Sequence, residues 1–162
     1  MLRIRSVNMD DLESLIAIEH LCFSAEEAGT REAFEMRIQR IPDSFFAAEK
    51  DGKILGLVNG PVIPKPFITD DLFAQINPNP LKGGHQSILG LAVSPHAQKQ
   101  GVATALLAHL EYEARRNERE TITLTCKEDL IPFYKKHGYV NRGVSNSEHG
   151  GVIWYNMTKD LC

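Results

Sequence analysis

The chain has 162 residues, of which 43% are hydrophobic and 24% are charged, and its formal net charge is −3. This composition is that of an ordinary globular domain, so it excludes a disordered, fibrous or collagen-like chain. The length suits one domain with one sizeable core, and we expect a single domain over residues 1–162. The slight acidity argues against a nucleic-acid partner, which would need many exposed cations, and suits a cationic small molecule better.

Neither a signal peptide nor a membrane span is predicted. The opening MLRIRSVNMDD lacks an apolar core, and runs such as ILGLAV fall short of the roughly 20 residues that cross a bilayer. We therefore expect a cytoplasmic protein with no membrane partner. The odd number and wide spacing of Cys22, Cys126 and Cys162 predict reduced thiols and no metal site, with a nucleophilic Cys126 as the alternative.

The first third of the chain predicts a strand, two helices and a hairpin. LRIRSV alternates like a half-buried strand, and Asn8 offers the N-cap of a first helix. A second amphipathic helix is predicted from about residue 30 to 40, before Pro42. SFFAAE and KILGLVNG are predicted to form a β-hairpin, because Asp51-Gly52 tolerates the positive φ of a tight turn.

The middle of the chain predicts a long excursion followed by a β-α-β unit. Residues 60–84 contain five prolines, too many for regular structure apart from a short turn near residues 69–75, and such an excursion is usually a binding loop. SILGLAV then predicts one continuous strand and TITLTC a second, which we expect to be parallel with a right-handed crossover. Between them lies a helix, VATALLAHLEYEARRN, whose predicted inward residues are Val102, Ala105, Leu106 and Leu110.

The C-terminal part predicts a short helix and a closing hairpin. In EDLIPFYKKHGY, Pro132 fits the first turn of a helix that carries Tyr134, and Gly138 fits the position just after it. YVNRGV and GVIWYNM, joined by SNSEHG, predict the hairpin. The whole pattern predicts an α/β (α+β) fold, with a mixed, twisted sheet of about seven strands flanked by about four helices.

The helix that opens at Gly101, in QKQGVA, has no acidic residue to cap it. The unpaired N–H groups of its first turn concentrate about half a positive charge, so this start suits an anion such as a pyrophosphate. Gly101 lets oxygen atoms approach the backbone, and Ala103 keeps the next turn small. A strand, a loop and a helix with a glycine between them is also common packing architecture, which by itself carries no function.

The pattern [QR]-x-x-G-x-[GA] between an apolar strand and an amphipathic helix, followed by IPFYKKHGY, resembles the GNAT superfamily of acyl-CoA-dependent N-acetyltransferases. LAVSPHAQKQGVATALLAHL, TLTCKEDLIPFYKKHGY and HGGVIWYNM are most similar to the arylalkylamine (serotonin) N-acetyltransferase branch and its microbial relatives. The resemblance implies a GNAT-type fold, acetyl-CoA as co-substrate and direct acetyl transfer to a primary amine. It assigns coenzyme binding to Leu91, Ala92, Val93, Gln98, Lys99, Gln100, Gly101, Val102, Ala103 and Thr104.

The same resemblance makes Tyr134 the general acid for the leaving thiolate. We further expect a backbone N–H around Leu91 to polarise the thioester carbonyl and stabilise the oxyanion. Ser87 and Leu89 stand where vertebrate relatives carry two histidines, so the general base stays open. Lys127 replaces an acidic residue of the vertebrate relatives, which weakens any transfer of their acceptor specificity. The candidates for the acceptor pocket and the base are Phe23, Glu26, Glu27, His85, His149 and Trp154. The two aromatic residues equally suit a core, and the four polar ones equally suit a solvated loop.

The acceptor also stays open at this point. An arylalkylamine is one candidate, and a polyamine, an amino sugar or a protein amine are others. A coenzyme A-binding module without catalysis is the alternative outside the enzyme class, suggested by the missing histidines. We expect a small-molecule amine as partner and no nucleic acid. The protein is expected to be a monomer or a homodimer.

Overall fold

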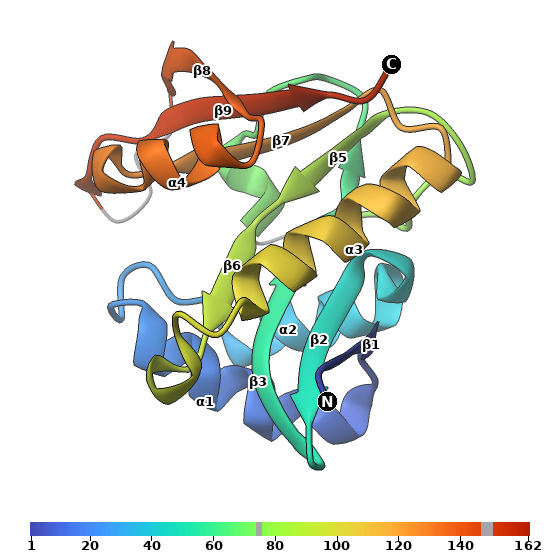
Figure 1. The fold of residues 1–162 in the computed structure, drawn as a ribbon. Helices are drawn as coiled ribbons and strands as arrows, with labels where there is room; N and C mark the ends of the chain where they lie inside the picture. Colours follow the sequence, from blue (N-terminus) through green and yellow to red (C-terminus); the bar gives the residue numbers. More distant parts are fainter. Residues whose placement is uncertain (74–75, 147–150) are drawn as a thin grey trace.

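The computed structural model describes residues 1–73, 76–146 and 151–162. Within these residues the chain forms nine strands and four α-helices, and the strands belong to two sheets (Figure 1). The first sheet has the order β1-β2-β3-β6, formed by Arg3–Ser6, Phe45–Lys50, Lys53–Asn59 and Gly90–Val93. The second has the order β4-β5-β7-β9-β8, formed by Val62–Ile63, His85–Ile88, Thr121–Cys126, Tyr155–Asp160 and Val140–Val144.

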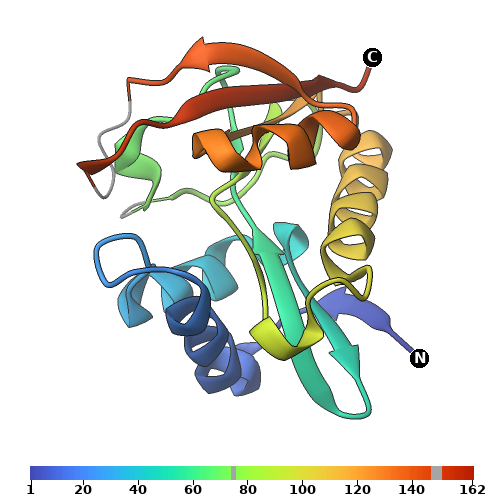
Figure 2. The same cartoon turned by 60° about the vertical axis from the view of Figure 1, so that its left-hand side comes forward.

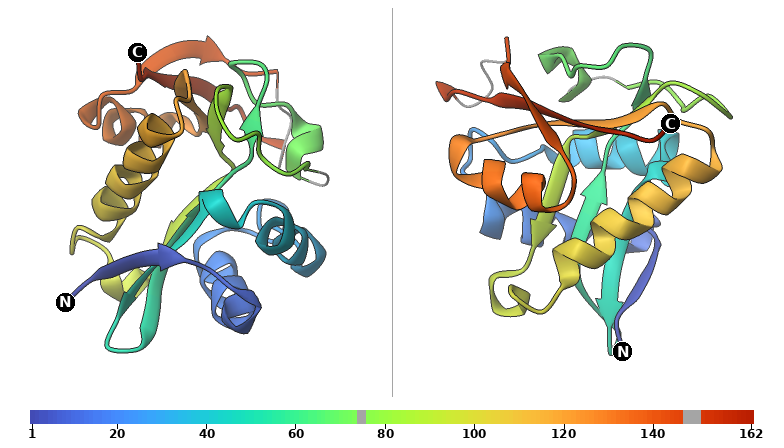
Figure 3. Two further views of the ribbon diagram at one scale, coloured as in Figure 1. Left: turned by 90° about the vertical axis from the view of Figure 1, so that its right-hand side faces the viewer. Right: turned by 45° about the horizontal axis from the view of Figure 1, so that its top comes forward.

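Helices cover both faces of the first sheet. Helices α1 (Leu12–Cys22) and α2 (Arg31–Arg40) lie on one face and α3 (Val102–Arg116) lies on the other, as Figure 2 shows. Helix α4 (Ile131–Lys136) packs against β8 and β9 of the second sheet. The N-terminus lies beside the first sheet and the C-terminus beside the second (Figure 3). Among the described helices, none is long and apolar enough to cross a membrane.

The first two helices begin close to their predicted starts, the first of them after the predicted cap Asn8. Asn8 and Asp11 exchange side-chain-to-backbone hydrogen bonds in a capping box, which starts a 3₁₀ turn that leads into α1. Thr30 caps α2 by accepting a hydrogen bond from the N–H of Ala33 at 3.1 Å. These starts confirm the two helices expected from the sequence.

Glycine and aspartate at two tight turns also behave as predicted. Asp51 and Gly52 have φ values of 52° and 78° and join β2 to β3 in the expected hairpin. Gly138, with φ 93°, ends α4, and the N–H of Tyr139 donates to the carbonyl of Tyr134 at 3.0 Å. The rings of these two tyrosines meet edge to face, with centroids 5.6 Å apart.

The run SILGLAV is not the continuous strand that its apolar pattern predicts, because it breaks at Leu89. Strand β5 joins the second sheet, where it pairs in parallel with β7 as expected, and β6 joins the first. The N–H of Leu89 donates to the carbonyl of Asn59 at 2.8 Å, although Asn59 is already paired with Gly90. Leu89 and Gly90 therefore both lie opposite Asn59, as in a β-bulge. The sequence does not reveal this break, because an apolar run is compatible with either sheet.

The last strand begins later than GVIWYNM predicts. Strand β9 pairs with the whole of β7, from Cys126 opposite Tyr155 to Thr121 opposite Asp160. Gly151 has a left-handed φ of 70°, so the chain is still turning there, and Trp154 precedes the strand. Most of the predicted turn SNSEHG lies outside the described residues.

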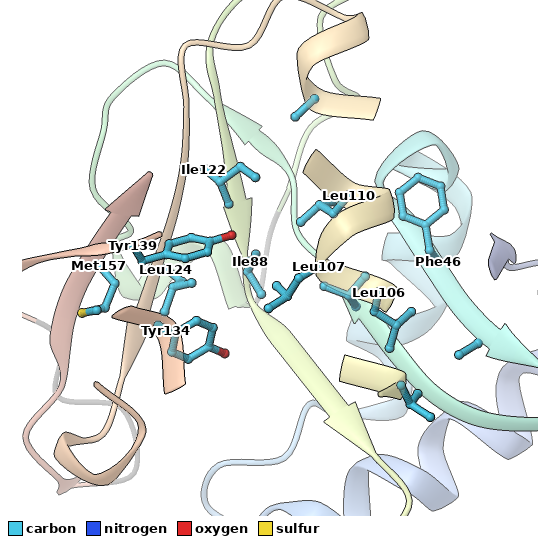
Figure 4. Packing of buried hydrophobic residues seen from close by; sticks show 14 of the residues in the cluster. Phe46, Ile88, Leu106, Leu107, Leu110, Ile122, Leu124, Tyr134, Tyr139 and Met157 are labelled. Carbon is cyan, nitrogen blue, oxygen red and sulfur yellow. The ribbon is translucent and has the colours of Figure 1, made fainter. Parts of the chain in front are cut away.

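Two buried clusters hold the helices on the sheets. The larger joins the first sheet and α3 to the second sheet and α4 (Figure 4), and the smaller lies under α1 and α2. Of the predicted inward residues of α3, Val102, Leu106 and Leu110 are buried and Ala105 is half-buried. Each fully buried large apolar side chain stabilises the fold by about 1.5–3 kcal/mol, so these two clusters hold the helices firmly on the sheets.

Candidate active site

The site lies where the two sheets part. Strand β5 pairs with β7 as far as Ile88 and Leu124, after which the chain passes into β6 and pairs with β3. Strand β7 continues through Thr125 and Cys126, which pair with β9 on their other edge. A cavity lies between the diverging strands, and Leu91 on β6 and Cys126 on β7 both line it.

Strand β6 is the edge of the first sheet, so its outer backbone groups face this cavity. The N–H of Ser94 donates to the carbonyl of Leu55 at 2.7 Å, and hydrogen-bonded positions alternate along an antiparallel ladder. The N–H of Leu91 therefore points away from β3, toward β7. The carbonyl of Val93 points outward too, where it accepts a hydrogen bond from the thiol of Cys22 at 3.2 Å. The Leu91 amide is thus oriented to donate to a carbonyl oxygen in the cavity.

A second hollow, an open groove, runs from Leu91 to the start of α3. Gly101 precedes the helix with φ 81°, and no described side chain caps the first turn, which contains no acidic residue. The first hydrogen bond of the helix runs from the N–H of Ala105 to the carbonyl of Gly101 at 3.0 Å. The N–H groups of residues 102–104 precede this bond and therefore have no acceptor within the helix. The predicted coenzyme residues that line this groove are Leu91, Val93, Gln98, Lys99, Gly101, Val102, Ala103 and Thr104.

Two predicted coenzyme residues do not line the groove. Ala92 is buried among the side chains under α1, on the other side of β6. Gln100 is exposed, and its side-chain amide donates to the carbonyl of His96 at 3.3 Å, which folds the loop before α3. The side chains of Ala92 and Gln100 thus belong to segments beside the groove but do not line it.

Tyr134 lies where the groove and the cavity meet, and it lines both. Its ring contacts Phe133 and Tyr139 edge to face, with centroids 5.0 and 5.6 Å away, and Figure 4 shows it beside Tyr139 in the core. The side chain is buried, and burial raises the pKa of its phenol, with a smaller contribution from Cys126. Tyr134 is therefore protonated at neutral pH, and its phenol proton lies at the junction of groove and cavity.

The thiol of Cys126 lies in the same cavity wall but is poorly suited to attack a thioester. Burial, with a smaller contribution from the charge of Asp129, raises its pKa to about 11. Only a thiolate is an effective nucleophile, so this environment disfavours the covalent alternative. All three cysteines are free thiols.

The cavity beyond Tyr134 is walled by aromatic and apolar side chains from segments far apart in the chain: Phe23, Phe73, Leu130 and Trp154. Glu27 lines it as well, but its carboxylate accepts a hydrogen bond from Nζ of Lys127 at 2.8 Å. The same ammonium lies 5.9 Å above the ring of Trp154. The charge of Glu27 is thus balanced within the wall, and the pair joins the loop after α1 to the loop after β7.

Two other predicted acceptor residues are not brought to the cavity, and a third is not described. His85 is at the start of β5, away from the gap, where Nδ1 contacts Oγ1 of Thr121 at 2.8 Å and Nε2 is 3.7 Å from Glu120. Glu26 is exposed in the loop after α1. His149 lies outside the described residues.

Several cavity residues were not selected from the sequence, among them Glu19 and Phe73. Glu19 follows Leu15 by four residues and therefore falls on the buried stripe of α1, a signal that helical periodicity provides. Phe73 comes from the 3₁₀ turn Asp70–Phe73, at the short turn predicted within the proline-rich excursion. The sequence predicts this turn, but no sequence pattern identifies Phe73 as a cavity residue. In the described part of the chain, no group of three or more His, Cys, Asp or Glu side chains is arranged to hold a metal.

The fold and the site together define a class of protein. Two sheets diverge around an outward-facing amide, beside an uncapped helix start that suits a diphosphate, and this arrangement fits the acyl-CoA-dependent transferase expected from the sequence. The chain belongs to the GNAT acetyltransferase family, because the family model described as Acetyltransferase (GNAT) family matches residues 12–139. Acetyl-CoA is accordingly its co-substrate.

Solved structures share this fold over nearly the whole chain. The GphF GNAT-like decarboxylase in complex with isobutyryl-CoA has a TM-score of 0.85 at 19% identity, covering 99% of this chain and 100% of that one. The ribosomal-protein-S18-alanine N-acetyltransferase from Escherichia coli has a TM-score of 0.75 at 18% identity, covering 99% and 94%. PaiA N-acetyltransferase from Thermoplasma acidophilum, in complex with coenzyme A, has a TM-score of 0.73 at 16% identity, covering 99% of each. At such identities the likeness establishes the fold.

Proposed function

We propose that this protein transfers acetyl directly from acetyl-CoA to a primary amine, and that arylalkylamines are its acceptor class. The observation that carries the proposal is the junction of the coenzyme groove and the aromatic-walled cavity at Tyr134. Acetyl-CoA in the groove would bring its thioester to Leu91, and the amine would approach from the cavity. The rings of Phe23 and Trp154 suit an aromatic or apolar amine tail.

In this mechanism each group performs one task. The N–H groups at the start of α3 bind the diphosphate and so fix where the thioester lies. The Leu91 N–H donates to the developing oxyanion, and one such donor is typically worth about 2.7–4 kcal/mol. Tyr134 gives its phenol proton to the departing sulfur. Cys126 stays a thiol, so acetyl passes to the amine without a covalent enzyme intermediate.

An amine panel tests the proposal, with acetyl-CoA as donor and free-thiol release as the readout. Phenethylamine-like compounds should give a higher kcat/KM than spermidine, an amino sugar or a peptide with a free N-terminus, and mass spectrometry should find the N-acetylated product. Preference for another member of the panel would overturn the acceptor class and leave acetyl transfer intact. Tight acetyl-CoA binding without thiol release from any amine would instead indicate a coenzyme-binding module.

One observation separates acetyl transfer from the decarboxylation that the name of the GphF relative describes. The carboxylate of Glu19 is buried in the cavity wall. A second carboxylate on an acyl chain, at about 5 Å and an effective dielectric constant of about 20, would be repelled by about 3 kcal/mol. Malonyl-CoA incubated without an amine should therefore stay intact, and release of carbon dioxide would count against the proposal.

A further inference from the structure

Glu19 is a carboxylate built into the wall of the acceptor cavity. It lies in the second half of α1 and is 5% exposed, and it lines the cavity together with Phe23 just beyond the helix. Burial of a carboxylate costs several kcal/mol unless neighbouring groups compensate. One such group is the N–H of Gly29, which donates to Oε2 of Glu19 at 2.8 Å and holds the loop after α1 against the helix.

The other carboxylate oxygen lies beside the strand that carries the oxyanion donor. A Cβ built on Gly90 would stand 3.9 Å from Oε1 of Glu19, an ordinary van der Waals distance, so this buried oxygen lies against the backbone of Gly90. Gly90 directly precedes Leu91, whose N–H faces the cavity. The carboxylate and the expected oxyanion donor are therefore neighbours along one wall, where an attacking nitrogen would have to lie.

A buried cation supports the charge of Glu19. Arg37 is 3% exposed, and its guanidinium donates to Oδ1 of Asn59 at 3.2 Å and to the carbonyl of Phe73 at 3.4 Å. Burial lowers the pKa of Arg37 to about 10, and the nearby charge of Glu19 opposes this lowering. Arg37 is therefore a cation at neutral pH, and the two buried charges stabilise each other.

The other carboxylate in this wall is engaged by a side-chain cation. Among the described residues that line the cavity, the carboxylates are those of Glu19 and Glu27. Glu27 accepts from Nζ of Lys127 at 2.8 Å, in a direct ion pair, whereas Glu19 accepts from the backbone N–H of Gly29 and has the charge of Arg37 nearby. The guanidinium of Arg37 donates to Asn59 and to the carbonyl of Phe73, so its interaction with Glu19 is electrostatic.

We propose that Glu19 binds the ammonium group of the acceptor and takes a proton from it, which makes Glu19 the general base and selects for cationic amines. This inference rests on the proposed acetyl transfer. The ammonium loses two protons in all. The first goes to Glu19 and then to solvent, freeing the lone pair that forms the C–N bond. When the C–S bond breaks, its electron pair stays on sulfur, which takes the proton of Tyr134, and the second nitrogen proton restores Tyr134.

Glu19→Gln tests the proposal, because the amide keeps the size of the side chain and can still accept from Gly29. With the best alkylamine of the panel, kcat/KM should fall about 100-fold or more, as expected for loss of a general base. The Kd for acetyl-CoA should stay within about twofold. Glu13→Gln is the matched control: Glu13 is on the same helix, exposed, and paired with Arg31 at 2.6 Å, so its loss should leave the rate unchanged.

A weakly basic nucleophile separates a catalytic role from a structural one. Hydroxylamine is largely uncharged at neutral pH and needs no base to free its lone pair, so Glu19→Gln should lower its rate by about tenfold or less. Equal losses with both nucleophiles, or an unchanged rate with the alkylamine, would overturn the role of Glu19 and leave acetyl transfer standing. If wild-type protein acetylates neither nucleophile, both proposals fall. Should the Gln variant fail to fold, Glu19→Asp must keep part of the alkylamine activity.

Discussion

A carboxylate added to the first turn of α3 should stabilise the free protein and weaken coenzyme binding. Thr104 is the third residue of the helix, exposed and lining the groove, in a turn that has no acidic residue. In Thr104→Glu the new charge would complement the helix dipole and raise the free energy of unfolding by about 0.3–1 kcal/mol. The same charge would oppose a diphosphate bound to the N–H groups of that turn.

The size of the second effect follows from the geometry of one helical turn. Side chains on adjacent turns lie about 5–6 Å apart, so we take about 5 Å between the new carboxylate and a phosphate charge. Coulomb's law then gives about 0.8 kcal/mol in water and about 3.3 kcal/mol at an effective dielectric constant of about 20. The affinity for acetyl-CoA should accordingly fall by between about 4-fold and 200-fold.

Titration calorimetry with acetyl-CoA measures this loss, and Thr104→Gln is the control because it has the same length without the charge. The difference between the two variants should shrink as salt is added, since the phosphate and the carboxylate both face solvent. Thermal unfolding of the free proteins should rank the Glu variant above the Gln variant. Equal Kd values for the two variants would refute the placement of the diphosphate at the start of α3.

Three further outcomes test the site and the fold. Tyr134→Phe should lower kcat about tenfold or more and leave the acetyl-CoA Kd unchanged, and wild-type turnover would remove Tyr134 from the mechanism. Intact-mass spectrometry after mixing with acetyl-CoA alone should find no acetylated protein, whereas an acetyl group on Cys126 would contradict direct transfer. Hydrogen bonds from Arg5 at 2.8 and 2.9 Å hold the pKa of Asp11 below its ordinary value, so this pair stabilises the protein above about pH 4 and the stability is lost as pH falls further. Asp11→Asn should cost about 1–3 kcal/mol at pH 7 and much less at pH 3 in urea unfolding, and an equal loss at both would contradict this pairing.

The parts of the fold that the sequence predicted depend on contacts between near neighbours in the chain. The capping box at Asn8, the Asp51-Gly52 turn and the uncapped start at Gly101 each follow from the chemistry of a few consecutive residues. The break at Leu89 does not, because it depends on which of two sheets each half of an apolar run joins. That choice is made by β3 and β7, which lie about 30 residues away on either side.

The same distinction between local and long-range contacts applies to the site. The groove residues are consecutive around the start of α3, so a local pattern identified most of them. The acceptor cavity collects residues from the two ends and the middle of the chain, such as Glu19, Phe73 and Trp154, and residue type alone does not show which loops meet. His85 illustrates the difference: it is three residues before the gap, and about 3.3 Å per residue along a strand carries it about 10 Å away.

The break in the strand that the sequence did not predict is also what makes the site chemically useful. If residues after Leu89 had continued alongside β7, the outward N–H of Leu91 would have entered the ladder between the two strands and could not serve a substrate. Because β6 turns to β3 instead, that amide faces the junction that Leu91, Leu130 and Tyr134 form between groove and cavity. Donor and acceptor can then occupy opposite sides of one junction together, so no residue is needed to carry the acetyl group between them. The raised pKa of Cys126, about 11, fits this geometry, because a thiol that stays protonated beside the thioester does not compete with the amine.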